Sequence, residues 1–278
     1  MILKFIKEKQ MNIREFYSKE GELPLDSFPQ SGGFTSIFRT IGCIGDSLSS
    51  GELESTQPDG SNGYHDYFDI SWGQYIAREA GVTVYNFSRG GMTAREFISG
   101  WGEDNGAFDK SKAAQCYIAA LGVNDLFGQG QDIGTVGDVD LENREGNNRS
   151  TFAGCYGELL CRYREIEPKS RIFLMTMPRE SSDDAKKMKL KHDHAELLRG
   201  IAAKNEFVYV IDLHRYAPIY DEEFKANFYL GGHMNAGGYL LTAKMVMSYI
   251  DYIVRQNPED FAQAGFIGKG VHSRHAKW

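Results

Sequence analysis

Five short runs of apolar residues recur along the chain, and stretches with helical periodicity separate them. Each run is almost continuously apolar, which is typical of strands that are buried on both faces of a sheet. The runs occupy residues 40–44, 82–87, 116–121, 171–176 and 207–211. Alternation of such runs with helical stretches predicts a doubly wound α/β domain with a parallel sheet.

Between the runs, apolar side chains recur at the spacing of one helix face. These stretches predict helices over residues 72–80, 93–100, 152–165, 182–204 and 236–254. We expect one domain over residues 36–256, with an N-terminal extension at 1–35 and a C-terminal tail at 257–278. Nothing in the pattern indicates a second independent core.

Two segments interrupt the strand–helix repeat. Residues 51–70 are long and polar but contain several aromatic side chains, and residues 127–149 hold five glycines. The second segment is too long for an ordinary connection, so we interpret it as a functional or mobile loop. For both segments two alternatives stay open, a variable surface loop or a role in shaping the substrate site.

Composition and charge narrow the class of protein. Glycine accounts for 31 of 278 residues, above the usual share of roughly 7%. The 31 basic and 38 acidic residues give a net charge of -7, which speaks against a nucleic-acid partner because such a partner calls for a basic face. No apolar run reaches 18 residues, so we expect no membrane segment and a cytoplasmic protein.

Small and polar residues follow three of the predicted strands. They are the segments 45–49, 86–93 and 122–125, and a fourth segment of this kind, 231–235, precedes the last predicted helix. Because ligands bind outside the carboxyl ends of parallel strands, we expect these segments to form the functional site.

The residues in these segments suit an acyl-transfer enzyme. A serine at a strand-to-helix turn, Ser47, can present its hydroxyl to a carbonyl carbon, and a histidine near the chain end can take its proton. The N–H groups of Ser47 and Gly91 and the side-chain amide of Asn124 can bind an oxyanion. In a supporting role, Asp46 would hold the serine turn and Asp125 the loop that carries Asn124.

The four segments resemble the blocks of the SGNH hydrolases, also called GDSL esterases/lipases. The letters GDSL stand at 45–48, Gly91 matches the glycine of the second block, Gly-x-Asn-Asp stands at 122–125, and His233 matches the histidine of the last block. The resemblance covers residues 40 to 255 approximately and keeps the order of the blocks. It implies a three-layer, flavodoxin-like α/β fold with a five-stranded parallel sheet flanked by helices.

The resemblance also implies the site roles. Ser47 would be the nucleophile and His233 the general base, and Ser47, Gly91 and Asn124 would form the oxyanion hole. One departure concerns the acid that usually stands three residues before the histidine, because Leu230 occupies that place. Three explanations compete: orientation of His233 by a main-chain carbonyl such as that of Leu230, an acid from elsewhere (Asp212, Asp221 or Glu222), or reduced or lost activity. We favour the carbonyl, since every other block is intact.

These features predict a short-chain, acetyl-type esterase that acts on a carbohydrate or another polar ester. The alternatives are a lipase or thioesterase with the same site, or a non-catalytic carbohydrate-binding protein on the same scaffold. His65 and Arg89 are candidate substrate contacts. The four cysteines match no zinc pattern, so we expect no metal and no cofactor, and a homo-oligomer stays open.

Overall fold

A parallel sheet of five strands forms the centre of the protein. The computed structural model describes residues 12–272 and residue 274. The sheet has the order β4-β1-β5-β6-β7, and every neighbouring pair is parallel. Its strands are β4 Thr83–Ser88, β1 Thr40–Gly45, β5 Cys116–Ala120, β6 Arg171–Met175 and β7 Val208–Ile211. The ends of each predicted run agree with the ends of one strand to within one residue. The strand order is that of flavodoxin-like folds, so the fold prediction is confirmed.

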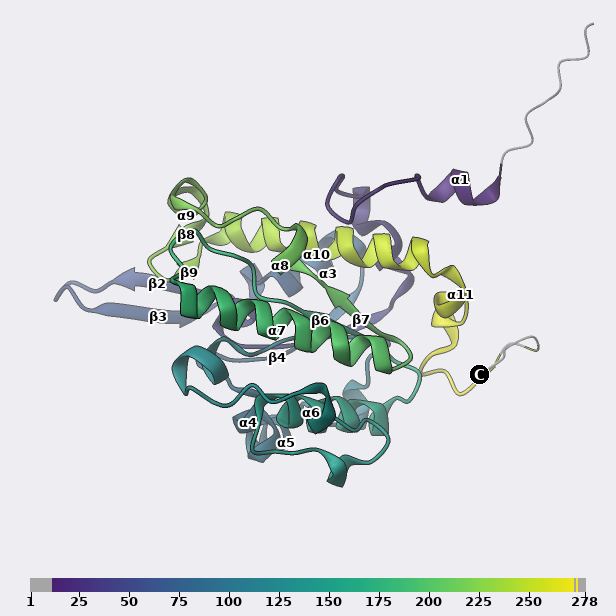
Figure 1. The fold of residues 1–278 in the computed structure, drawn as a ribbon. Coiled ribbons are helices and arrows are strands. Elements are labelled where there is room, and N and C mark those ends of the chain that lie inside the picture. The colour runs from purple at the N-terminus through teal and green to yellow at the C-terminus, as the bar shows by residue number, and fades with distance from the viewer. Residues whose placement is uncertain (1–11, 273, 275–278) are drawn as a thin grey trace, which may run out of the picture.

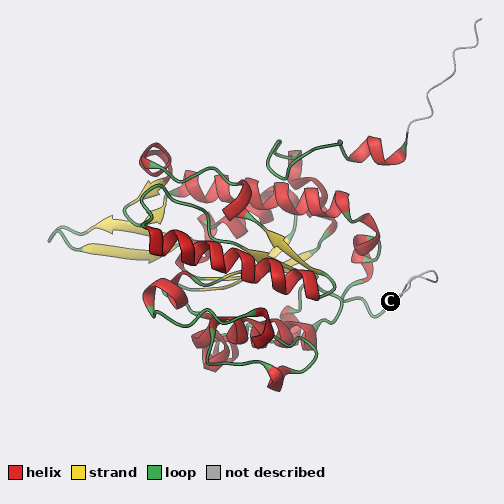
Figure 2. Ribbon diagram, viewed as in Figure 1, coloured by secondary structure: helices red, strands yellow, loops and turns green. Residues whose placement is uncertain are grey.

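Helices cover both faces of this sheet, which gives three layers (Figures 1 and 2). The α-helices are α1 Ile13–Tyr17, α2 Ser47–Ser50, α3 Trp72–Ala80, α4 Ala94–Glu96, α5 Gly102–Asp104, α6 Phe152–Ile166, α7 Ala185–Lys204, α8 Leu213–Tyr216, α9 Glu222–Phe228, α10 Ala236–Gln256 and α11 Pro258–Phe261. Shorter 3₁₀ and π turns include η1 Gln30–Ile37, η3 Phe97–Trp101 and η5 Asn124–Gly128. Within the described part of the chain, no helix combines the length and apolarity needed to cross a membrane.

The sheet divides the core into two halves. Ile41 and Cys43 of β1 pack into the half that α3 and α10 cover, whereas Ile44 packs into the half that α6 and α7 cover. This alternation follows from the period of two in a strand. Because helices cover both faces of the sheet, polar residues can gather at the edge formed by the carboxyl ends of the strands.

The polar segment after α2 is a β-hairpin and not a loop. Strands β2 Glu52–Thr56 and β3 Asn62–Asp66 pair antiparallel, and Figure 1 shows them projecting beside β8 Tyr229–Leu230 and β9 His233–Met234. The hydroxyl of Tyr239 on α10 donates to the carbonyl of Glu52 at 2.7 Å, which fixes the base of the hairpin. The turn residues Pro58-Asp59-Gly60 are a signal in the sequence that could have indicated it.

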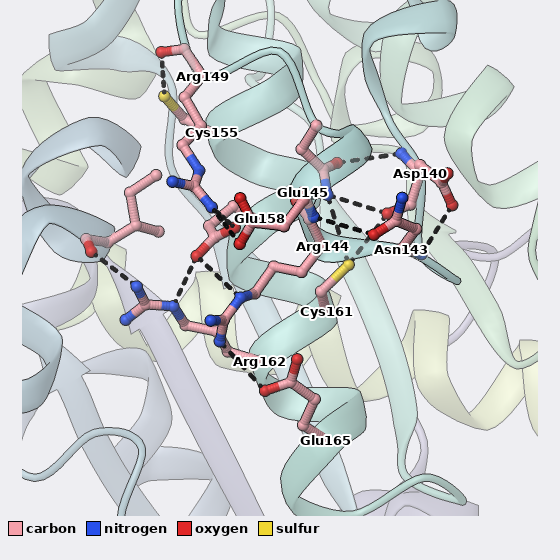
Figure 3. Close-up of polar contacts among 12 residues, drawn as sticks. Asp140, Asn143, Arg144, Glu145, Arg149, Cys155, Glu158, Cys161, Arg162 and Glu165 are labelled. Atoms are coloured by element: carbon pink, nitrogen blue, oxygen red, sulfur yellow. Dashed lines mark hydrogen bonds and ion pairs between the residues drawn. The ribbon is translucent and has the colours of Figure 1, made fainter.

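The glycine-rich segment 127–149 is attached to α6 by ion pairs and hydrogen bonds. Arg149 lies 3.0 Å and Arg144 3.7 Å from the carboxylate of Glu158, and Arg162 of α6 binds the same carboxylate at 2.9 Å (Figure 3). The side chain of Asn147 is largely buried and donates to the carbonyl of Asp140. These contacts attach the segment to the fold.

Glu158 is the centre of this attachment, and its replacement tests it. Only 1% of its side chain is exposed, while its arginine partners stay partly exposed. We expect Glu158→Gln to lower the free energy of unfolding by about 2–4 kcal/mol, between the values for a charged hydrogen bond and a fully buried ion pair. Urea denaturation measures this change.

Glu165→Gln is the matched control, because Glu165 binds Arg144 at 3.3 Å with a side chain that is 57% exposed. An exposed ion pair of this kind contributes less than about 1 kcal/mol to the free energy of unfolding. Equal losses in the two variants would show that the segment does not depend on Glu158.

Candidate active site

Ser47 stands at the point where the strand order of the sheet reverses. It follows β1, which has β4 on one side and β5 on the other, and it is the first residue of α2. The carboxylate of Asp46 accepts the N–H of Leu48 at 3.0 Å and caps the helix, and burial raises the pKa of Asp46 to about 7. A Cβ atom at Gly45 would lie 2.1 Å from the hydroxyl of Ser49, so the turn into α2 requires glycine there.

Two main-chain donors near Ser47 are free. Gly91 has a φ of +72°, a left-handed conformation that favours glycine. Within the described residues, the N–H groups of Ser47 and Gly91 donate to no protein acceptor. Both groups are therefore available to an oxygen atom that carries developing negative charge.

Asn124 and Asp125 connect the segment after β5 to the segment after β4. The side-chain amide of Asn124 donates one hydrogen to the carbonyl of Met92 at 3.1 Å, which leaves its second hydrogen free. Asp125 is fully buried and accepts the N–H of Ala94 at 2.9 Å, and burial raises its pKa to about 6. This pair of bonds sets the distance between the Gly91 segment and the amide of Asn124.

His233 begins β9, and β9 contacts α2, which carries Ser47. The two nitrogens of its ring face two glutamates of β2. Nδ1 lies 2.6 Å from Oε1 of Glu54, and Nε2 lies 3.1 Å from Oε1 of Glu52. The expectation that the carbonyl of Leu230 orients the ring is thus corrected, because a side-chain carboxylate occupies that place.

The three acids that the sequence offered as alternatives serve other purposes. Asp212 binds Arg199 at 2.8 Å, Asp221 caps α9, and Glu222 is exposed at the start of that helix. Leu230 is the cross-strand partner of His233 and is 45% exposed. Sequence reasoning missed both glutamates, since 179 residues separate Glu54 from His233 and no spacing rule connects them.

Ser47 and His233 form no hydrogen bond with each other among the described contacts, because Glu52 occupies the Nε2 side of the ring. Burial, with the nearby charges of Asp66 and Glu54 as smaller contributions, raises the pKa of Glu52, while the charge of His233 opposes this shift. A protonated Glu52 can donate to Nε2 when the ring carries its hydrogen on Nδ1. Catalytic hydrogen bonds are often absent before substrate binds.

The two candidate substrate contacts each bind another side chain. Nε2 of His65 lies 2.9 Å from the hydroxyl of Ser55, and the alternation of β3 places His65 on the hairpin face opposite Tyr64. Arg89 binds Glu96 at 2.7 Å, and both side chains are partly exposed. Their roles toward a substrate stay predictions.

A cleft of about 400 Å³ opens beside the site. Its lining includes a chain neighbour of three of the four predicted site residues: Leu48 next to Ser47, Val123 next to Asn124, and Gly232 next to His233. A second hollow of about 60 Å³ has almost entirely apolar walls and shares Leu48, Val123, Met177 and Pro178 with the cleft. Phe127 is the only residue of the 127–149 segment in the cleft lining, so most of that segment lies elsewhere.

Part of the cleft lining is charged. The charged lining residues are Glu180, Asp183, Lys187, Lys191 and Lys225. Lys191 is buried and binds both Glu180 and Asp183, at 2.7 and 2.6 Å. Among the described residues, no group of three or more His, Cys, Asp or Glu side chains has the arrangement to hold a metal ion.

Solved structures of other proteins share this fold. A protein from Lactobacillus plantarum superposes with a TM-score of 0.56 at 18% identity, covering 77% of this chain and 97% of its own. A possible lipase from Chitinophaga pinensis gives 0.51 at 18% identity, covering 79% and 98%. A family two carbohydrate esterase from Clostridium thermocellum, in complex with cellohexaose, gives 0.53 at 13% identity, covering 80% and 65%.

At these identities the likeness concerns the fold. No curated protein matches the chain. A sequence model of the GDSL-like Lipase/Acylhydrolase family matches residues 43–241, which hold Ser47, Gly91, Asn124 and His233. The chain therefore belongs to the GDSL-like lipase/acylhydrolase family and is a hydrolase of the esterase type.

Proposed function

We propose that this protein hydrolyses carboxylic esters through an acyl-enzyme on Ser47, with a short acyl group and a carbohydrate or another polar alcohol as its substrate. The observation that carries the proposal is that three hydrogen-bond donors lie at the edge of the sheet that carries Ser47. They are the free N–H groups of Ser47 and Gly91 and the amide of Asn124, at one edge of the sheet. Donors fixed in advance around an oxyanion are a main source of catalysis in acyl transfer.

The reaction would proceed in two halves. The hydroxyl oxygen of Ser47 attacks the ester carbon, Nε2 of His233 takes its proton, and the three donors hold the resulting oxyanion. The intermediate collapses to the acyl-enzyme, and the leaving alcohol takes the proton back from the ring. Water then attacks the acyl-enzyme by the same sequence and frees Ser47.

The two hollows support a small acyl group and a polar alcohol. The apolar hollow next to Leu48 has a volume of about 60 Å³, which accommodates only a few non-hydrogen atoms. The lining of the larger cleft includes charged side chains such as Lys187 and Lys225, and these suit a hydroxylated alcohol better than a fatty chain. Tyr64, with 56% of its surface exposed beside His233, offers a ring to a sugar.

The binding-protein alternative depended on the missing acid at Leu230. A carboxylate 2.6 Å from Nδ1 of His233 removes that support. The carbohydrate esterase with bound cellohexaose shares the fold with this chain, and the carbohydrate part of the proposal depends on Tyr64 and the charged cleft.

Replacement of the nucleophile tests the mechanism. We expect Ser47→Ala to lower the rate of 4-nitrophenyl acetate hydrolysis by on the order of 10⁴-fold or more, because the acyl acceptor is lost. A serine-reactive phosphonate should label the wild type at Ser47. Ser99→Ala, at an exposed serine, is the matched control, and a normal rate in Ser47→Ala would sink the proposal.

Removal of the side-chain donor tests the oxyanion hole. Asn124→Ala should lower kcat by roughly 10²–10³-fold with little change in KM, since the donor acts on charge that develops in the transition state. Steady-state kinetics on the same ester measure both constants. A change confined to KM would place Asn124 in ground-state binding instead.

A chain-length series tests the acyl group. We expect kcat/KM to fall from acetyl through butyryl to octanoyl 4-nitrophenyl esters, because the inner hollow has no room for longer chains. Val123→Ala enlarges both hollows and should reduce the difference between acetyl and butyryl esters. A preference of the wild type for octanoate would contradict the acetyl-type assignment.

A further inference from the structure

We propose that Glu54, carried by the β2–β3 hairpin, is the acid that positions His233 for catalysis. The inference deepens the ester hydrolysis proposed above and rests on it. The residue three positions before His233 is Leu230, which has no carboxylate. Glu54 instead reaches the ring from a strand that is far away in the sequence. Glu54 would act through His233 and not on the substrate.

The carboxylate of Glu54 is fixed by two donors. Its Oε1 atom lies 2.6 Å from Nδ1 of His233 and accepts the N–H of Gly232 at 2.9 Å. Only 14% of its side chain is exposed, so water competes weakly for these bonds. A hydrogen bond to a carboxylate of this length is of the strong, charge-assisted kind, and it places the ring hydrogen on Nδ1.

The turn between β8 and β9 has the shape that this carboxylate needs. A Cβ atom at Gly231 would lie 2.0 Å from Oε2 of Glu54, and one at Gly232 would lie 2.9 Å from Oε1. Gly231 has a φ of +65°, which by itself favours glycine, but the φ of Gly232 lies outside the left-handed region. The space for Glu54 is therefore a separate physical reason for a glycine at position 232.

The hairpin presents one face to His233. Successive side chains of a strand alternate between its faces, so Glu52 and Glu54 share a face with their cross-strand partners Asp66 and Tyr64. The ring of Tyr64 meets the ring of His233 edge to face, with centroids 5.9 Å apart. Ser50 of α2 donates to Asp66, which connects the hairpin to the helix that carries the nucleophile.

The two glutamates occupy opposite sides of the imidazole. Nδ1, on the side of Glu54, must keep its hydrogen during catalysis, whereas Nε2, on the side of Glu52, must accept the proton of Ser47. Glu54 thus sets the tautomer that the reaction needs. Glu52 lies 3.1 Å from Nε2, on the side that must receive the proton of Ser47, so its contact with the ring has to give way to Ser47 during catalysis.

The first experiment is a kinetic comparison with a rescue. Glu54→Gln should lower kcat by on the order of 10²–10⁴-fold with little change in KM, because its amide can hold the wrong tautomer. Asp59→Asn makes the same charge change at the exposed tip of the hairpin and should keep the wild-type rate. Thermal unfolding shows whether each variant is folded.

Leu230→Asp in the Glu54→Gln background supplies the rescue. Cross-strand partners have Cβ atoms about 5 Å apart, and Leu230 is the partner of His233, so an aspartate there can reach the ring. We expect the double variant to have a kcat at least tenfold higher than that of Glu54→Gln alone. A merely structural role of Glu54 in the hairpin would give no such recovery.

Gly232→Ala tests the same assignment from the opposite side of the contact. The added Cβ displaces the carboxylate of Glu54 without removing it, so kcat should fall and KM should change little. Gly265→Ala, where a Cβ meets no atom within 4 Å, is the control. An unaffected kcat in Gly232→Ala would contradict the close fit of Glu54.

A spectroscopic readout separates this inference from the proposed function. Proton NMR of the wild type should show an exchangeable resonance far downfield of the amide region, from the Nδ1–H bound to Glu54. It should vanish in Glu54→Gln and persist in Glu52→Gln. If the resonance shows this pattern but the wild type has no esterase activity, the contact between Glu54 and His233 is confirmed and the proposed ester hydrolysis is wrong. If the wild type is an esterase but Glu54→Gln keeps both kcat and the resonance, the assignment of Glu54 is overturned.

Discussion

In the proposed reaction the imidazole of His233 can take a proton from serine only if its own hydrogen sits on the far nitrogen, and the contact with Glu54 would impose that arrangement. The contact is 2.6 Å long and is shielded from solvent on the hairpin side. The β2–β3 hairpin, the Gly231–Gly232 turn and the hydroxyl of Tyr239 each help to place one of its two partners. Much of the architecture around the site serves this one geometric requirement.

Glycine has a specific physical task in this site. At Gly45 a Cβ would collide with Ser49, at Gly232 it would displace the carboxylate of Glu54, and at Gly91 the main chain adopts a left-handed conformation. A Cβ at Gly90 would likewise lie 2.2 Å from the carboxylate of Glu52. The glycine surplus of the sequence is partly the consequence of packing two carboxylates and several N–H groups into a small volume.

The two segments that interrupt the strand–helix repeat have different roles. The hairpin 52–66 contributes Glu52, Glu54 and Tyr64 to the surroundings of His233. The segment 127–149 binds α6 through Glu158 and contributes only Phe127 to the cleft. Their lengths and polarities are similar in the sequence, so these properties do not tell a segment that contacts His233 from one that binds α6.

The chain pattern by itself determined the strands, the main helices, the family, and the segments at 45–48, 91 and 122–125 that meet at the sheet edge, because local periodicity and parallel strand order place them there. It also predicted the histidine, since the last segment precedes α10. Only the tertiary structure decided which acid faces that histidine. Glu54 and His233 are 179 residues apart, and their meeting depends on how a projecting hairpin folds back over a tight turn, which no local pattern encodes.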